Sequence, residues 1–427
     1  MENVLTLYTD IHKENEGGFL EVPFTVPENI GEIRIQVSVM SEEPEKCIID
    51  VGVSDPTKVR GWSGGSKYDL TISLDQATPG YRAGEINPGR WAVLLGAYTV
   101  DRAGAHVETT ITLSERRSKW FRGDLHIHTL HSDGAYTLSE IDTIAKTQDL
   151  NFIGLTDHNT VSQNFEFPRE SPVTYIPAME LTTYRGHCNL FGVTNPVDDF
   201  RVLDQTTLDK AIATAKERGA YVALNHPHDT SYPSCSWQWS WDFDFDWLEV
   251  WNGPWRPYNQ QTLDWWQGQL ESGRKLVAIG GSDTHRPHPQ VRHGMPTTWV
   301  MSESKSSQAL LEAIDQGHVF ISYKPTGPTL DFTCGGYIIG DTVPSGEVDE
   351  LVLIINHLEA GDIIHLISEQ GTEKTFTIQS DTSEFKYQWH AECRKFWRVE
   401  VWRRFGEVDD TLMAALCNPI YFDTSVD

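Results

Sequence analysis

The stretch from Asp124 to Gly134 constrains the fold of this chain more than any other, and it reads Asp-Leu-His-Ile-His-Thr-Leu-His-Ser-Asp-Gly. His126 and His128 alternate with apolar residues, so on an extended strand both imidazoles leave from one face. Two neutral imidazoles are costly to bury unless another group uses their nitrogens, and a metal ion is the commonest such group. Asp133 follows five residues after His128, so the stretch predicts a metal site at the end of a strand.

Strands alternate with helices between residues 119 and 325. The strands expected from apolar runs are 121–128, 152–156, 173–178, 187–193, 221–224, 248–251, 276–280 and 318–322, and the expected helices are 137–150, 204–218, 262–272 and 306–316. Most of these strands end at, or next to, a His, Asp or Glu. Because catalytic groups of (β/α) barrels lie at the C-terminal ends of the strands, the pattern predicts an α/β fold with a distorted, TIM-like (β/α)7 barrel over residues 119–325.

Both flanking regions, residues 1–118 and 326–427, consist of short β-type runs between turn residues. Each is expected to form a small β-sandwich beside the barrel. Residues 1–118 contain no cluster of chemically useful side chains, so we interpret this region as a structural module or one that contacts another copy of the chain.

Nine imidazoles and carboxylates near the barrel strands are the candidate metal ligands: His126, His128, Asp133, His158, Glu180, His187, His226, Asp283 and His285. Such a set could not share a cavity without cations to offset its lone pairs and charge. Nine ligands exceed what one ion takes, which predicts two or three divalent ions. Imidazole and carboxylate without thiolate suit Zn, Mn or Fe about equally well.

Several motifs in this region resemble one family when they are read together and in order. They are Asp-Leu-His-Ile-His-Thr at 124–129, Thr-Asp-His at 156–158, Glu180, His187, Asn-His-Pro at 225–227, Leu-Glu-Val-Trp-Asn-Gly at 248–253 and Ser-Asp-Thr-His at 282–285. The chain resembles the PHP (polymerase and histidinol phosphatase) superfamily of metal-dependent hydrolases, and within it the carbaryl-hydrolase-like branch. The resemblance covers residues 119–325, about half of the chain, and the flanking β-domains also occur in that branch.

The resemblance implies three metal positions. The first ion would be held by His126, His128, Glu180 and Asp283; Glu180 would bridge to a second ion held also by His187 and His226; and Asp133, His158 and His285 would hold a third. The family often has histidine where Asp133 stands, so two and three ions both remain open.

A hydroxide that bridges two ions is a nucleophile at neutral pH and needs no protein nucleophile. This agrees with the lack of a Gly-x-Ser-x-Gly segment around a candidate serine. Asp157 is expected either to orient a ligand imidazole or to be an ordinary carboxylate of the turn after its strand. His228 is expected either to protonate a leaving group or to pack beside Pro227.

The expected substrate is a small molecule, either an anion or an aryl ester. Arg185 and Arg286 lie next to candidate ligands and are candidates for binding the non-bridging oxygens of a phosphoester, although each could be a solvated loop charge. Eight tryptophans between residues 237 and 266 would form either an aromatic lid suited to an aryl leaving group or core beneath a long loop.

Composition narrows the possible partners and the compartment. A formal net charge of −27 argues against nucleic acid and anionic membranes as partners. The six cysteines show no C-x-x-C spacing and are typical of reduced thiols. Neither a secretory signal nor a membrane span is visible, so a cytoplasmic location is expected, and oligomers through the β-domains are an open possibility.

The leading hypothesis is a metal-dependent hydrolase, in first place a phosphoesterase, acting through the bridging hydroxide. One alternative is a carboxylic or carbamate ester hydrolase that uses the same metals, since a metal-bound hydroxide attacks either electrophile. Another is a non-catalytic, metal-stabilised binding scaffold, but a scaffold needs only one closed site, and this chain offers more ligands than one site uses.

Overall fold

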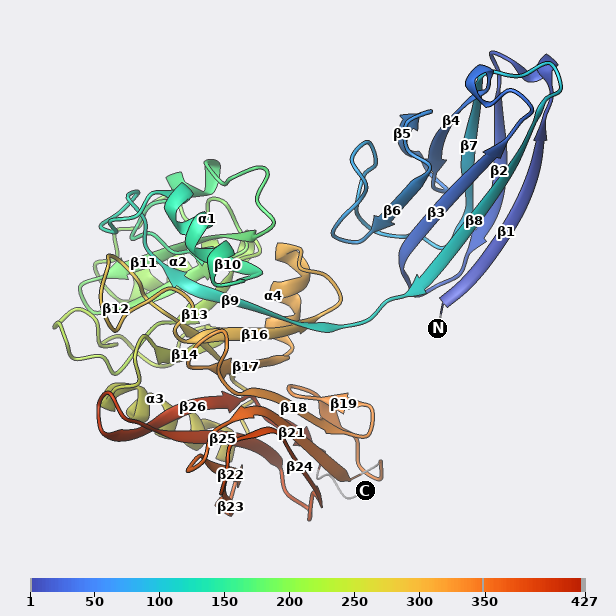
Figure 1. Cartoon of the computed structure of the whole chain (residues 1–427). Coiled ribbons are helices and arrows are strands. Elements are labelled where there is room, and N and C mark those ends of the chain that lie inside the picture. Colours follow the sequence, from blue (N-terminus) through green and yellow to red (C-terminus); the bar gives the residue numbers. More distant parts are fainter. Residues whose placement is uncertain (1, 348, 424–427) are drawn as a thin grey trace. The chain divides into compact units, whose positions relative to one another are not determined.

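The computed structural model describes residues 2–347 and 349–423, and the chain divides into two compact units, Met1–Ser118 and Lys119–Asp427 (Figure 1). Among the described residues no helix is both long and apolar enough to cross a membrane.

The first unit is a β-sandwich of two four-stranded antiparallel sheets, ordered β1-β8-β3-β6 and β2-β7-β4-β5. The strands are β1 (Glu2–Ile11), β2 (Phe19–Val26), β3 (Ile30–Met40), β4 (Ile48–Ser54), β5 (Val59–Gly64), β6 (Asp69–Ser73), β7 (Gly89–Thr99) and β8 (Ala105–Glu115), with short 3-10 helices at Lys13–Asn15 and Pro44–Lys46. In β3, Ile33, Ile35 and Val37 are buried between the sheets while the residues between them are exposed. This period of two is what makes the segment one face of a sandwich.

Seven strands of the second unit form a ring. They are β9 (Lys119–Ile127), β10 (Phe152–Leu155), β11 (Thr174–Thr183), β12 (Gly186–Phe191), β13 (Tyr221–Leu224), β14 (Trp247–Asn252) and β15 (Val277–Gly281). Neighbouring strands pair in that order, and β12 alone runs antiparallel to its neighbours. Backbone hydrogen bonds from Asp283 N to His126 O (2.8 Å) and from His128 N to Thr284 O (3.0 Å) join the end of β15 to β9. The C-terminal ends of β9 and β15 are therefore held side by side.

The predicted (β/α)7 alternation is not what the structure shows. The α-helices of this unit are α1 (Leu138–Thr147), α2 (Gln205–Glu217), α3 (Pro257–Glu271) and α4 (Ser307–Asp315), and a 3-10 helix, η3 (Ser162–Phe165), lies between β10 and β11. β11 and β12 form a hairpin whose turn includes Gly186 at a φ of 121°, and antiparallel strands need no helical crossover. The connection from β13 to β14 is irregular. The ring is thus a distorted barrel with helices in only part of its connections.

Local capping signals account for where the helices begin. Thr137 Oγ1 accepts a hydrogen bond from Glu140 N (3.2 Å), and Thr137 N donates to the Glu140 carboxylate (2.8 Å), which forms a capping box at the start of α1. Asp204 forms a capping box with Thr207 at α2, and the Ser306 side chain accepts a hydrogen bond from Ala309 N at α4.

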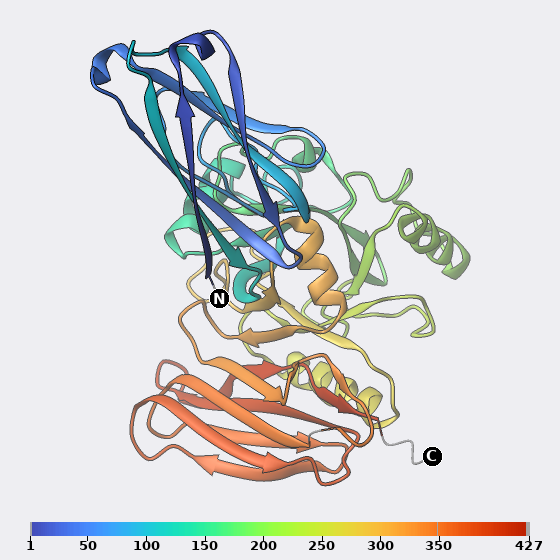
Figure 2. The ribbon, with the colours of Figure 1, turned by 90° about the vertical axis from the view of Figure 1, so that its right-hand side faces the viewer.

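The strand order of the ring continues into the C-terminal region. β16 (Thr297–Ser302), which we did not predict, pairs with β9 and with β17 (Val319–Ser322), and β17 pairs with β26. The remaining strands are β18 (Thr329–Cys334), β19 (Tyr337–Ile338), β20 (Thr342–Val343), β21 (Glu350–Leu358), β22 (Ile363–Ser368), β23 (Gly371–Thr377), β24 (Thr382–His390), β25 (Phe396–Phe405), β26 (Asp410–Cys417) and β27 (Ile420–Phe422). They form two layers, β19-β18-β21-β24 against β26-β25-β22-β23 (Figure 2). Residue 326 is therefore not a break in the sheet.

Asn418 ties the ring to the C-terminal sandwich. Its buried side chain accepts a hydrogen bond from Ala278 N (2.8 Å) and donates to Ala278 O (2.9 Å) and Val319 O (3.1 Å). A side-chain amide that satisfies three backbone groups of β15 and β17 replaces strand pairing at this junction.

We predict that Asn418→Ala lowers the free energy of unfolding by about 2–4 kcal/mol, because Ala278 N and Ala278 O lose their side-chain partner, while Val319 O keeps its bond to the backbone N–H of residue 418. Denaturant unfolding followed by tryptophan fluorescence measures this change. Asn195→Ala, at an exposed asparagine, is the matched control and should change stability little. Equal stability of the two variants would show that the junction does not depend on Asn418.

Candidate metal centre

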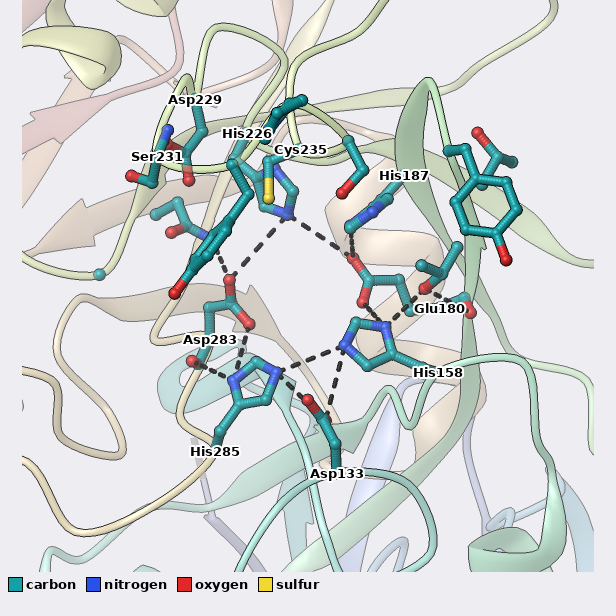
Figure 3. A pocket seen from close by; sticks show the side chains of 18 of the residues that line it. Asp133, His158, Glu180, His187, His226, Asp229, Ser231, Cys235, Asp283 and His285 are labelled. Atoms are coloured by element: carbon teal, nitrogen blue, oxygen red, sulfur yellow. Dashed lines mark hydrogen bonds and ion pairs between the residues drawn. The ribbon is translucent and has the colours of Figure 1, made fainter.

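The nine predicted ligands lie together at the C-terminal end of the ring. They form four overlapping groups, and within each group the candidate ligand atoms lie within 4.8 Å of one another. Figure 3 shows seven of them facing a common centre: Asp133, His158, Glu180, His187, His226, Asp283 and His285. The nine candidates come from β9, β11, β12 and the loops that follow β9, β10, β13 and β15.

The carboxylate of Glu180 is the hub of this arrangement. Its oxygens lie 3.5 Å from His126 Nε2 and 3.6 Å from His128 Nε2. Oε1, the oxygen nearest His126, also lies 3.2 Å from His187 Nδ1 and 3.6 Å from His226 Nε2, and Oε2 lies 2.6 Å from His158 Nδ1. Glu180 shares one group of candidate ligand atoms with His126 and His128 and another with His187 and His226. Glu180 is therefore placed to contact two ions.

Asp283 completes the group around His126, in β9, and His128, directly after β9. Its Oδ1 lies 3.4 Å from His126 Nε2 and 3.1 Å from His128 Nε2. Its second oxygen, Oδ2, lies 4.0 Å from His226 Nε2.

A third group lies nearer the solvent and contains His128, Asp133, His158 and His285. Asp133 Oδ1 lies 3.6 Å from His158 Nε2 and 3.4 Å from His285 Nε2, and these two imidazole nitrogens lie 3.3 Å apart. His158 and His285 are half-buried and Asp133 is exposed, whereas His126, His128 and Glu180 are completely buried. Water therefore competes for an ion at this exposed group more than it would at the buried groups around Glu180.

Divalent ions fit the residues present, because several buried donor atoms have no other partner. Among the described residues, the buried side-chain atoms without a hydrogen-bond partner include His126 Nε2, His128 Nε2, His187 Nε2 and His226 Nδ1. A buried polar atom without a partner costs about 1–3 kcal/mol, and four of these lie on imidazoles of one cluster. Coordination to cations would satisfy such atoms together.

The charges of the cluster shift its pKa values. Burial opposes ionisation of Glu180, yet His158, His187 and His126 hold its pKa well below the usual range. Burial likewise opposes protonation of His226, but Glu180, Glu249 and Asp283 raise its pKa to about 9. Burial lowers the pKa of His128 to about 4. The carboxylates are thus ionised and ready to bind cations, and His226 carries a proton at neutral pH that an ion would have to displace.

Two carboxylates that the sequence analysis missed hold the ligands in place. Glu249 Oε1 lies 2.8 Å from His126 Nδ1, and its other oxygen accepts hydrogen bonds from His226 N (3.0 Å) and Asn252 Nδ2 (3.1 Å). Fixing Nδ1 of His126 leaves its Nε2 free to bind metal. The sequence signal for Glu249 was its charge, because it lies between the apolar residues Leu248 and Val250 of the predicted strand.

The second is Asp124, two residues before His126 and therefore on the same face of β9. It is fully buried and accepts hydrogen bonds from the backbone N–H groups of His126 (3.2 Å), Ser282 (2.9 Å) and Gly294 (2.7 Å). Burial raises its pKa to about 6. Through its hydrogen bonds to His126 N and Ser282 N, Asp124 joins the end of β9 to the loop that carries Asp283.

Close backbone approach and unusual dihedrals also mark the site. Any Cβ at Gly281 would lie 2.3 Å from His126 Cβ and 2.9 Å from Glu249 Oε1, so only glycine fits there. His226 and Asp283 are candidate ligands with positive φ angles, 26° and 52°. Such conformations are costly for residues with a Cβ and cluster at functional sites.

The other predicted residues lie around the site. The Asp157 carboxylate accepts hydrogen bonds from Thr129 N (2.8 Å), Thr129 Oγ1 (2.9 Å) and Ser132 Oγ (2.6 Å), so it holds the loop after His128 and meets no imidazole in these bonds. His228 Nδ1 lies 3.0 Å from Thr262 Oγ1, and its ring packs on Trp241. His228 is not among the described residues that line the cavity over the metal cluster.

Both predicted arginines are exposed and also absent from the described lining of that cavity. Arg185 packs its guanidinium over Trp239, and Arg286 donates a hydrogen bond to Asp133 O (3.2 Å). The arginines that do line it are Arg201 and Arg256. Arg201 is paired with Asp199 (2.6 Å), whereas Arg256 has no carboxylate partner among the described residues. Arg256 was missed because nothing in its sequence context distinguishes it from a solvated loop charge.

The cavity has a volume of about 910 Å³ and includes Glu180, His187, His226 and Asp283. The described residues that line it contain no tryptophan. Trp237, Trp239 and Trp266 are buried in the hydrophobic core of this unit, and Trp241, Trp255 and Trp265 pack against that core. Of the two interpretations of the tryptophan-rich segment, the structure favours core.

No protein-family model and no curated protein matches this chain. Among solved structures, it is similar to a two-domain protein from Bacteroides vulgatus ATCC 8482 containing a predicted PHP-like metal-dependent phosphoesterase, with 18% identity over 70% of this chain and 95% of that one and a TM-score of 0.41. It is also similar to an amidohydrolase from Chromobacterium violaceum, with 17% identity over 40% and 89% of the chains and a TM-score of 0.31. These similarities are too low to carry a functional conclusion.

We predict that Glu249→Gln weakens metal binding about 10- to 100-fold, because the amide no longer fixes His126 as a carboxylate does. Titration with Mn²⁺ followed by calorimetry measures the affinity. Glu217→Gln, at an exposed glutamate, is the control and should bind like the wild type. Unchanged affinity in Glu249→Gln would mean that His126 does not need this partner.

Metal affinity should also rise as the pH increases from 6 to 9. His226 has a pKa of about 9 in the metal-free protein, so below that pH a bound ion must displace its proton. Affinity should increase about tenfold per pH unit for each proton displaced, and protons should be released on binding. Calorimetry in buffers with different ionisation enthalpies counts these protons; no release at pH 7 would contradict the assignment of His226 as a ligand.

Proposed function

We propose that this chain is a metal-dependent hydrolase of the PHP type that cleaves small phosphoesters. The observation that carries the proposal is the set of buried, unpartnered donor atoms around the single carboxylate of Glu180, at the floor of an open cavity. A structural ion would be enclosed by its ligands, whereas this cluster faces a space large enough for a substrate.

Each group of residues has a distinct task in this proposal. His126, His128, Glu180 and Asp283 would hold one ion, and Glu180, His187 and His226 a second. When bound, two such ions lower the pKa of a water and offset negative charge on the substrate oxygens. Asp133, His158 and His285 would hold a further ion at the more exposed group, so two and three ions both remain compatible with the proposal.

Arg256 supports a phosphoester as the substrate. Its Nη1 donates to Tyr258 OH (3.1 Å), Tyr258 OH donates to Asn252 Oδ1 (3.4 Å), and Asn252 Nδ2 donates to Asp283 Oδ2 (3.3 Å). The chain of hydrogen bonds connects Arg256, which has no carboxylate partner among the described residues and lines the cavity, to Asp283. A guanidinium suits the non-bridging oxygens of a phosphate, and it would orient them toward the ions.

Hydrolysis of carboxylic or carbamate esters at the same centre is the alternative. The metal ligands serve both reactions equally, and Arg256 is the feature that favours phosphate. A non-catalytic scaffold is disfavoured by the open cavity over the cluster.

We predict that Arg256→Ala lowers kcat/KM for 4-nitrophenyl phosphate about 10- to 100-fold, because a charge-assisted hydrogen bond to the substrate is lost. Hydrolysis of 4-nitrophenyl acetate, which lacks the anionic oxygens, should change much less. Both activities should disappear with a chelator and return with Mn²⁺ or Zn²⁺.

Arg185→Ala and Arg286→Ala are matched controls, since both guanidinium groups lie outside the described lining of the cavity. They should affect phosphate hydrolysis less than Arg256→Ala. Faster turnover of the acetate than of the phosphate, with no effect of Arg256→Ala, would favour the carboxylic ester alternative.

A further inference from the structure

Four large apolar side chains that are open to solvent gather at the mouth of the cavity. Tyr184 is 93% exposed, Leu203 80%, Tyr232 70% and Phe200 46%, and all four line the cavity that contains the metal cluster. We call these four residues the apolar rim. Single exposed apolar residues are ordinary, but a group of them around one cavity marks a binding surface.

Two of the rim residues lie in segments that carry candidate metal ligands. Tyr184 lies in the turn of the β11–β12 hairpin, whose strands supply Glu180 and His187. Tyr232 lies in the connection after β13 that also contains His226. Phe200 and Leu203 lie between β12 and α2. The hairpin therefore sets the distance from Tyr184 to Glu180 and His187.

The cavity divides into a polar floor and an apolar mouth. A phosphate group bound by the ions and Arg256 would fill only a small part of 910 Å³. Further apolar residues, Val202, Pro233 and Val291, also line the cavity, together with the polar residues Arg201, Ser231 and Ser234. A substrate that consisted of a phosphate on a small polar alcohol would leave this apolar surface in water, and so would gain nothing from it.

From this division we infer that the apolar rim is a specificity subsite for an aromatic ring on the leaving alcohol of the phosphoester, a conclusion that rests on the proposed function. The ring would pack against the side chains of the apolar rim. Flat aromatic groups make the largest apolar contact with tyrosine and phenylalanine rings. The rim residues are thus binding residues, and they take no part in bond cleavage.

Two esters with matched chemistry test this inference. Ethyl phosphate and 2-phenylethyl phosphate are both esters of primary alcohols, so they differ chiefly in the ring that the rim would bind. The wild type should show a kcat/KM at least about tenfold higher for the phenyl compound, mainly through a lower KM. In the double variant Tyr184→Ala/Tyr232→Ala the ratio of the two kcat/KM values should fall toward 1.

Phe165→Ala is the matched control, since Phe165 is an exposed aromatic residue outside the described lining of the cavity. It should keep the wild-type ratio. Equal kcat/KM values for the two esters in the wild type, or a ratio that the double variant leaves unchanged, would overturn the inference. An unchanged ratio together with a wild-type dimer that dissociates in the double variant would assign the rim to contacts between copies of the chain.

Binding of two phosphonates separates this inference from the proposed function. Calorimetry with ethylphosphonate and 2-phenylethylphosphonate, in the presence of Mn²⁺, requires no catalysis. If neither ester is hydrolysed but the phenyl compound binds about tenfold more tightly and loses this advantage in the double variant, the subsite stands and the hydrolase assignment falls. If both esters are hydrolysed but the two phosphonates bind equally well, the subsite falls alone. If neither ester is hydrolysed and neither phosphonate binds, both proposals fail.

Discussion

The contact between one buried carboxylate and the imidazoles around it is the interaction on which the rest of this site depends. Glu180 is completely buried, and imidazole nitrogens of five histidines lie within 3.6 Å of its oxygens: His126, His128, His158, His187 and His226. A carboxylate in that position must be compensated by positive charge, which protons or metal ions can supply. The unpartnered imidazole nitrogens of the cluster are what protons alone leave unsatisfied.

The surrounding fold can be understood as a means of keeping these groups in place. Glu249 fixes His126, Asp124 joins the end of β9 to the loop that carries Asp283, and Gly281 lets these segments approach closely. The positive φ angles of His226 and Asp283 show that the backbone accepts an unfavourable conformation at two ligand positions. Rigid support of this kind is needed because metal geometry tolerates only small displacements of its ligands.

Strand periodicity and strand ends predicted which candidate side chains would lie together, because they locate side chains without knowledge of the tertiary fold. His126 and His128 share a face by simple alternation, and the structure brings all nine candidates together. The helices predicted from residues 137, 204 and 306 do begin there, at caps formed by Thr137, Asp204 and Ser306. The apolar run at 173–178 did not show that β11 continues to Thr183 and turns directly into β12. The insertion of β16 beside β9 was missed because it depends on pairing between distant segments. Arg256 and the apolar rim were missed for the same reason, since a loop residue becomes part of a cavity only through the fold.

Metal content of the purified protein is the measurement that tests the central claim most directly. Elemental mass spectrometry on the wild type, beside Glu180→Ala and the more conservative Glu180→Gln, counts the ions, and thermal unfolding shows whether each variant remains folded. Two or three equivalents in the wild type, with loss of metal in both folded variants, is the result that we expect. A single tight equivalent that survives the loss of Glu180 would contradict a carboxylate-bridged hydrolase centre and would identify a structural ion instead.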